Sequence, residues 1–273
     1  MMKRTASLFL ALLMSLSLMA QGQVSTRKYR LSDFLDKMTK VVMSGDEVLC
    51  SALKQEVVNV WTSTTFEFCS LEQFEKIKTS EEYYFLIPVE SEGLMLLTLV
   101  KGGPQAQKGI SDMHEIITLP ISSALGTSSR DLVYLGGTVQ AIQDFTLAAM
   151  ESEKTAYLMS GWFNTRTKFK GKEVYVAQED LSSAIKEKDL QKLEKNSALH
   201  IVPAQQADEQ YQEFTPDALV SFVIAPALPE AGQLCYKLLF EADTHRLCRI
   251  DKEKITEKKG EGFLFSDLAG LGK

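Results

Sequence analysis

The stretch EVLCSALKQ, residues 47–55, returns later in the chain as EDLSSAIKE, residues 179–187. At an offset of 132 residues, five positions of the two stretches are identical and two more are close substitutions. A sequence that repeats a segment at a fixed offset is typical of a duplicated structural unit. We therefore compared the sequence on both sides of the two stretches.

Each copy of the stretch has the apolar spacing of an amphipathic helix. In the first copy Leu49, Leu53 and Val57 share one face, which predicts a helix over 46–61 with Asp46 as its N-cap. The second copy predicts a matching helix over 179–194.

The flanking segments match in order as well. Short runs rich in β-branched and aromatic residues predict strands in both halves. In the first half the predicted strands are 40–43, 65–70, 83–89, 94–100 and 114–121. In the second half they are 172–176, 198–203, 221–227, 234–240 and 245–250, with a hairpin turn at 242–245.

Helices are predicted between and before these strands. Ser70 and Gln73 form a capping-box pattern that opens a short helix, and 204–214 is its counterpart. A helix is expected in front of each half, over 31–40 and over the longer segment 131–150. The glycines of YLGG in the longer helix suggest close packing of a neighbour.

These patterns predict an α/β (or α+β) fold of two tandem, duplicated β-α-β-α-β-β units with mixed sheets, each preceded by a helix. The first unit is expected at 24–125 and the second at 126–273, with an insertion at 152–173 that has no counterpart in the first. The alternative is a chance likeness between two amphipathic helices.

The order of a helix, a strand (FEF or LHIV), a short helix and an apolar strand (YYFLIPV or SFVIAPA) resembles small α/β domains of the bacterial envelope. The N-terminal domain of the TolB translocation protein and the curli-secretion lipoprotein CsgG share this order. The resemblance covers about 45 residues in each half and implies an envelope scaffold. The lipid-bearing cysteine of the curli protein and the propeller that follows the TolB domain have no counterpart here.

The N-terminus predicts export. Lys3 and Arg4 precede an apolar run from Leu8 to Ala20, which is the pattern of a signal peptide over residues 1–20. Cleavage is expected after Ala20 or after Gly22. The apolar run is too short to cross a bilayer, and no transmembrane segment is expected after cleavage. The expected location is the periplasm, the outer membrane or the extracellular space.

The charge balance excludes some partners. Cleavage would leave 28 basic and 36 acidic residues, a net charge of −8. This balance argues against binding of nucleic acid.

Four cysteines in an exported chain allow disulfides. Cys50 near the start of helix 46–61 and Cys69 near the end of strand 65–70 are expected at the same end of their elements, so a bridge between them is possible. Cys235 and Cys248 lie too far apart on their predicted hairpin for a bridge.

The sequence contains no G-x-G-x-x-G or Walker-type nucleotide-binding loop and no H-E-x-x-H, G-x-S-x-G or C-x-x-C motif. Asp112 and His114 share one face of a predicted strand end, but two ligands do not complete a zinc site. No catalytic, metal or cofactor residue is therefore predicted, although a site assembled from separate loops would leave no local motif.

The insertion is the strongest candidate for contact with a partner. Its aromatic residues are followed by cations at a spacing of two, which an extended chain would place on one face. The candidate contact residues are Tyr157, Trp162, Phe163, Arg166, Lys168, Lys170 and Lys172. The alternative is a solvated edge strand whose aromatic residues cover the core.

Two functional hypotheses follow. The first is an exported, non-catalytic envelope or secreted protein that binds an envelope protein, an anionic glycan or a lipid head group. The second is a hydrolase or a small-ligand-binding protein with its site in the cleft between the two units.

Overall fold

The computed structural model describes residues 31–44, 46–152, 154–155, 159–164 and 169–272. The expected signal peptide lies outside the described residues. Among the described helices, none combines the length and the apolar character that a membrane span needs.

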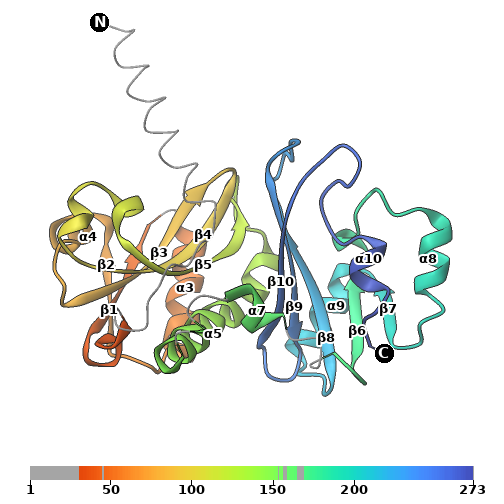
Figure 1. Cartoon of the computed structure of the whole chain (residues 1–273), viewed down its shortest axis with the longest axis horizontal. Helices are drawn as coiled ribbons and strands as arrows, with labels where there is room; N and C mark the ends of the chain where they lie inside the picture. The colour runs from red at the N-terminus through yellow and green to blue at the C-terminus, as the bar shows by residue number, and fades with distance from the viewer. Residues whose placement is uncertain (1–30, 45, 153, 156–158, 165–168, 273) are drawn as a thin grey trace, which may run out of the picture.

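Two five-stranded mixed sheets form the framework, and they have the same topology (Figure 1). The first sheet contains β1 (Met38–Met43), β2 (Phe66–Ser70), β3 (Tyr83–Ser91), β4 (Leu94–Lys101) and β5 (His114–Ser123), in the order β2-β1-β3-β4-β5. The second contains β6 (Glu173–Ala177), β7 (Leu199–Val202), β8 (Ala218–Ile224), β9 (Leu234–Glu241) and β10 (Leu247–Lys254), in the order β10-β9-β8-β6-β7.

The strand directions are also the same in both sheets. In each sheet the first strand pairs in parallel with the second and third, and the last three strands are antiparallel neighbours. The predicted α/β fold with two similar mixed-sheet units is therefore confirmed.

Helices fill the connections of both units. The α-helices are α3 (Glu47–Val60), α4 (Leu71–Ile77), α5 (Ser129–Glu151), α7 (Met159–Phe163), α8 (Glu187–Leu193), α9 (Ala204–Gln212) and α10 (Phe265–Leu268). Short 3-10 turns are η1 (Phe34–Asp36), η2 (Pro104–Gln107), η3 (Ile110–Asp112) and η5 (Gln178–Asp180).

The predicted helix starts in the first unit are confirmed. The side chain of Asp46 accepts hydrogen bonds from the backbone N–H groups of Val48 and Leu49 at the start of α3. Ser70 and Gln73 form a capping box at the start of α4. Both arrangements satisfy backbone donors that a helix start leaves unpaired.

The predicted helix over 31–40 is wrong. Apart from Leu31, only η1 is helical there, and β1 begins at Met38. Thr39 and Lys40 pair with residues of both β2 and β3. The β-branched run that starts at Thr39 favours a strand, and pairing on both sides outweighs the apolar spacing upstream.

The predicted helix over 179–194 is also wrong, although this segment contains the second copy of the repeated stretch. It forms η5, an extended piece and then the short α8. Asp180 and Ser182 exchange backbone hydrogen bonds with Phe263, at 2.8 and 2.9 Å. Pairing with the C-terminal segment therefore replaces the first helical turns, and the resemblance to α3 is in sequence only.

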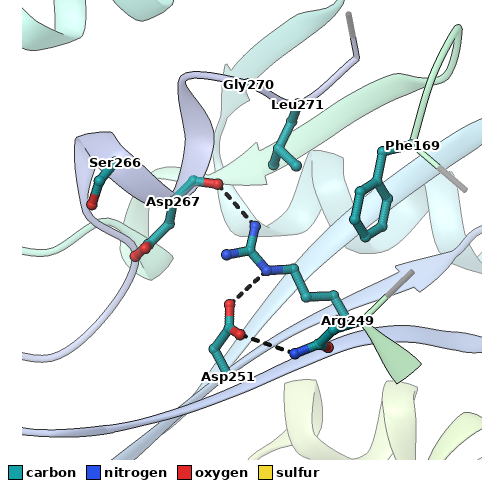
Figure 2. Close-up of a pocket in the computed structure, with 8 residues that line it drawn as sticks. Phe169, Arg249, Asp251, Ser266, Asp267, Gly270 and Leu271 are labelled. Atoms are coloured by element: carbon teal, nitrogen blue, oxygen red, sulfur yellow. Dashed lines mark hydrogen bonds and ion pairs between the residues drawn. The ribbon is translucent and has the colours of Figure 1, made fainter. Parts of the chain in front are cut away.

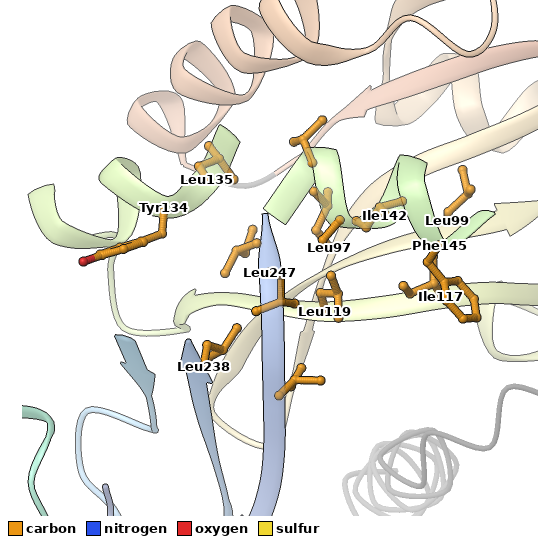
Figure 3. Packing of buried hydrophobic residues seen from close by; sticks show 14 of the residues in the cluster. Leu97, Leu99, Ile117, Leu119, Tyr134, Leu135, Ile142, Phe145, Leu238 and Leu247 are labelled. Carbon is orange, nitrogen blue, oxygen red and sulfur yellow. The ribbon is translucent and has the colours of Figure 1, made fainter. Parts of the chain in front are cut away.

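The long helix α5 lies between the two sheets and contributes to one shared core. Buried residues of α5 and β5, such as Ile142 and Leu119, belong to the same cluster as Leu238 and Leu247 of the second sheet (Figure 3). Because α5 packs against both sheets, the boundary expected near residue 125 stays a prediction.

The two sheets turn opposite faces toward α5. In the first unit the inner helix is α3, which connects β1 to β2, whereas α4 covers the outer face. In the second unit the inner helix is α9, which connects β7 to β8, and α8 and α10 cover the outer face (Figure 1). The units therefore repeat in topology but are not packed in equivalent ways.

Candidate functional site

A pocket of about 520 Å³ opens where the end of the insertion meets β10 and α10. Its walls come from three parts of the second unit that are distant in sequence. The lining residues are Asn164, Phe169, Arg249, Asp251, Ser266, Asp267, Gly270 and Leu271.

Arg249 is the central donor of the pocket. Its Nε donates to Asp251 Oδ2 at 2.5 Å, and its Nη1 donates to the backbone carbonyl of Asp267 at 2.9 Å. Figure 2 shows the guanidinium held between these two partners, while Phe169 and Leu271 form an apolar part of the wall. Nη2 makes no hydrogen bond to a described residue. One edge of the guanidinium is therefore left for a ligand.

Asn164 fixes the insertion to the edge of the second sheet. Its side-chain amide donates to the carbonyl of Ile250 at 3.0 Å and accepts from the N–H of Ile250 at 2.8 Å. The same amide nitrogen contacts Asp251 Oδ1 at 3.2 Å. The asparagine thus satisfies backbone groups of the edge strand β10 and orients one carboxylate of the pocket.

A buried lysine supports the pocket from behind. Lys237 on β9 donates to Glu253 at 2.7 Å and to Asp267 at 2.6 Å. Burial by itself would lower the pKa of Lys237, but the hydrogen bonds to Asp267 and Glu253 outweigh it and raise this pKa. Lys237 is therefore a fixed cation that anchors α10 rather than a nucleophile.

A second polar cluster closes the end of β6. Arg130 at the start of α5 pairs with the buried Asp180, at 2.6 and 2.9 Å, and with Asp208 on α9, at 3.0 Å. Tyr134 donates to Asp208 at 2.7 Å, and Ser221 donates to Asp180 at 2.5 Å. Burial raises the pKa of Asp208, and the hydrogen bonds from Tyr134 and Arg130 reduce this effect.

This cluster has the character of a structural network. Besides Asp180, the guanidinium of Arg130 also donates to the carbonyl of Ser221 at 3.1 Å, so each of its nitrogens has a partner. A network whose donors are all satisfied holds elements together and leaves little capacity for a ligand. It fastens α5 to η5, α9 and β8.

Trp162 and Phe163 of the insertion are packed against the core. Phe163 is buried, and its ring lies 6.2 Å from that of Phe145 on α5. Trp162 is half-buried and meets the same ring edge-on at 5.9 Å. This is the arrangement of the alternative interpretation, in which these aromatic residues cover the core.

The predicted cationic face is not formed by the described part of the insertion. The chain turns at Lys170 and Gly171, where Gly171 has a φ of +75°, so Lys170 and Lys172 do not share an extended strand. Lys170 is exposed, and Lys172 pairs with Glu241 at 3.1 Å. Tyr157, Arg166 and Lys168 lie outside the described residues.

Cys50 and Cys69 are not bridged, and all four cysteines carry thiols. Cys69 belongs to the cluster on the outer face of the first sheet, together with Val42 and Phe74 of α4. Its neighbour Phe68 instead packs on the α3 side. Because successive strand residues point to opposite faces, Cys69 points away from the helix that carries Cys50.

No group of three metal-ligating side chains occurs among the described residues. The three histidines are also dispersed, in β5, in β7 and in the turn between β9 and β10.

Most of the pocket is not predicted from the sequence. The insertion, which supplies Asn164 and Phe169, is the one part of it that is predicted as a contact region. The signal for the rest was the alternation of Arg249, Asp251 and Glu253 at a spacing of two, which places charges on one face of β10. The predicted strand 245–250 is too short to include this alternation, because β10 continues to Lys254.

No protein-family model matches the chain, and neither the curated proteins nor the solved structures contain a match to it. The likeness to the TolB and CsgG domains therefore stays a prediction.

Proposed function

We propose that this protein is exported and that it binds a small, neutral, polar ligand in the pocket beside the insertion. The observation that carries the proposal is the guanidinium of Arg249, which two protein acceptors hold rigidly while Nη2 lacks a described partner. A donor that is positioned in advance loses little entropy when it binds an acceptor. The volume of about 520 Å³ suits a small molecule.

The charges of the lining favour a neutral ligand. Arg249 is accompanied by two carboxylates, those of Asp251 and Asp267, so the lining residues carry a net negative charge. An anionic ligand would be repelled, whereas hydroxyl groups can accept from Nη2 and donate to carboxylate oxygens. Phe169 and Leu271 offer carbon surface for the apolar part of a ligand. Sugars combine these features.

The same lining favours binding over hydrolysis. Ser266 is the only hydroxyl or thiol side chain of the described lining, and no histidine accompanies it. A serine nucleophile needs an adjacent base. The carboxylates of the lining are engaged otherwise, since Asp251 accepts from Arg249 and Asp267 accepts from Lys237. A scaffold role is a second candidate, and it is favoured by the exposed side chains of Leu125 and Leu228.

Gly270 allows a direct test, because it lines the pocket and a Cβ at this position would meet no other atom within 4 Å. We expect at least one neutral mono- or disaccharide to raise the thermal midpoint of the wild type and of Gly270→Ala. Gly270→Trp should fold normally but lose this shift, because the indole occupies the pocket. Small carboxylates serve as the contrast.

A sugar shift that Gly270→Trp retains, a shift caused only by carboxylates, or no shift with any compound would contradict the proposed ligand. Export is tested on the same preparation, since the mature protein recovered from its source should begin at Gln21 or Gln23. An intact Met1 would rule out the exported form.

A further inference from the structure

Four connections meet at one end of the molecule and form a continuous surface. They are the start of α3, the β3–β4 turn, the β5–α5 connection and the β8–β9 connection. The N–H of Ala124 donates to the carbonyl of Gly93 at 2.9 Å, and that of Ala227 donates to Ser123 Oγ at 3.1 Å. Thr127 Oγ1 donates to Asp46 Oδ2 at 3.1 Å. We call this surface the loop end.

The loop end exposes large apolar side chains. Leu125 and Leu228 are each 75% exposed, more than any other large apolar residue that the structure describes, and Val48 is 55% exposed. The hydrogen bond between Ser123 and Ala227 joins the connections that carry the two leucines. Clustered apolar residues that a fold leaves in water commonly mark an interaction surface.

The four connections themselves carry charges of one sign, while Lys252 of the neighbouring strand β10 lies within electrostatic range of Glu92. The segments 44–48, 91–93, 123–128 and 225–233 contain Asp46, Glu47, Glu92 and Glu230, and their sequences include no lysine, arginine or histidine. Glu47, Glu92 and Glu230 are exposed beside the apolar residues. An anionic lipid surface would be repelled by this rim, whereas basic residues on a partner would be attracted to it.

We propose that the loop end docks an apolar segment of a partner protein that is flanked by lysine or arginine residues. Leu125 and Leu228 would contact the apolar residues of the partner, and the surrounding carboxylates would select its basic flanks. The hydrogen bonds among the four connections hold this surface in place before binding, which limits the entropy cost of docking. The proposal does not depend on the pocket, which has a different set of lining residues.

The test uses two synthetic amphipathic peptides of equal length, one of leucine and lysine and one of leucine and glutamate. Fluorescence anisotropy should detect binding of the leucine–lysine peptide only. The Leu125→Ser, Leu228→Ser double variant should bind it at least about tenfold more weakly. Glu92→Gln with Glu230→Gln should also weaken it and should reduce the salt dependence of binding.

Leu35→Ser with Val58→Ser is the matched control, because these residues are 53% and 60% exposed at other places on the surface. This control should bind the leucine–lysine peptide as the wild type does. Equal binding by the wild type and the Leu125, Leu228 double variant would overturn the proposal. Leucine-dependent binding to phosphatidylcholine vesicles instead of the peptide would show that the occupant is a membrane.

Discussion

At the scale of single residues, the carboxylate of Glu56 has little around it that offsets the cost of burying its charge. It is half-buried on α3, and its Oε2 occupies the space where a Cβ on Gly136 of α5 would stand, 2.4 Å away. Burial raises the pKa of Glu56 above its ordinary value of 4.5, and no hydrogen bond or charge from the described residues opposes this effect. The folded state therefore binds the carboxyl proton of Glu56 more tightly than the unfolded chain does.

This shift predicts how stability depends on pH at this position. Because the folded pKa is raised, the contribution of Glu56 is fully present below its unfolded value near 4.5 and is lost as the pH rises through the folded value. Glu56→Gln should therefore melt higher than the wild type at pH 7, by about 1–2 °C, since water screens part of the penalty at a half-exposed group.

Thermal melts of both proteins from pH 4 to pH 8 check this prediction. The two midpoints should converge near pH 4, where both side chains are neutral. A variant that melts lower than the wild type at pH 7 would mean that the Glu56 carboxylate has a stabilising partner.

At the scale of elements, two adjacent glycines set how closely α5 approaches its neighbours. A Cβ at Gly137 would lie 2.4 Å from Tyr211 Oη and 2.7 Å from the carbonyl of His245. Tyr211 cannot move easily, because its ring is stacked on His245 at 3.8 Å and contacts Tyr134 and Phe240. The close packing expected from the glycines of YLGG is thus present.

Alanine substitution should change the stability of the protein differently at these two glycines. Gly137→Ala should destabilise the protein by about 1–3 kcal/mol, because backbone and a fixed ring block the new methyl group. Gly136→Ala meets only the mobile end of Glu56 and should be neutral or stabilising by up to about 1 kcal/mol, the helix preference for alanine. Urea unfolding of the two variants measures the difference, and the reverse order would contradict this packing.

The individual elements also show which parts of the structure can be predicted from the sequence and which cannot. Strands such as 83–89 were predictable because β-branched and apolar runs reflect burial on both sheet faces, and Asp46 and Ser70 were predictable because caps act locally. The segment 179–194 was not, because its conformation depends on hydrogen bonds to Phe263, about 80 residues away. Arg249 and Asn164 likewise meet only through packing. The alternation of Arg249, Asp251 and Glu253 indicates a charged face on β10, but it does not indicate that the insertion packs against this face.

At the scale of the whole molecule, the two units share one core although their topology is repeated. The cluster around α5 includes Leu53 of α3 as well as Leu238 and Phe240 of β9. Arg130 fastens the start of α5 to the second sheet, since its partners Asp180 and Asp208 lie in η5 and α9. The inner faces of both sheets therefore contribute to the same buried cluster around α5.

This shared core predicts that the chain unfolds in a single cooperative transition. Calorimetric and van't Hoff enthalpies should agree, as they do for a two-state protein. Leu53→Ala in the first unit and Leu238→Ala in the second should each cost about 2–5 kcal/mol, because both remove buried methyl groups from the same cluster. Each variant should lower the midpoint of the whole transition. Two separate transitions, with each substitution moving only one of them, would instead mean that the units fold independently and that α5 belongs to one of them alone.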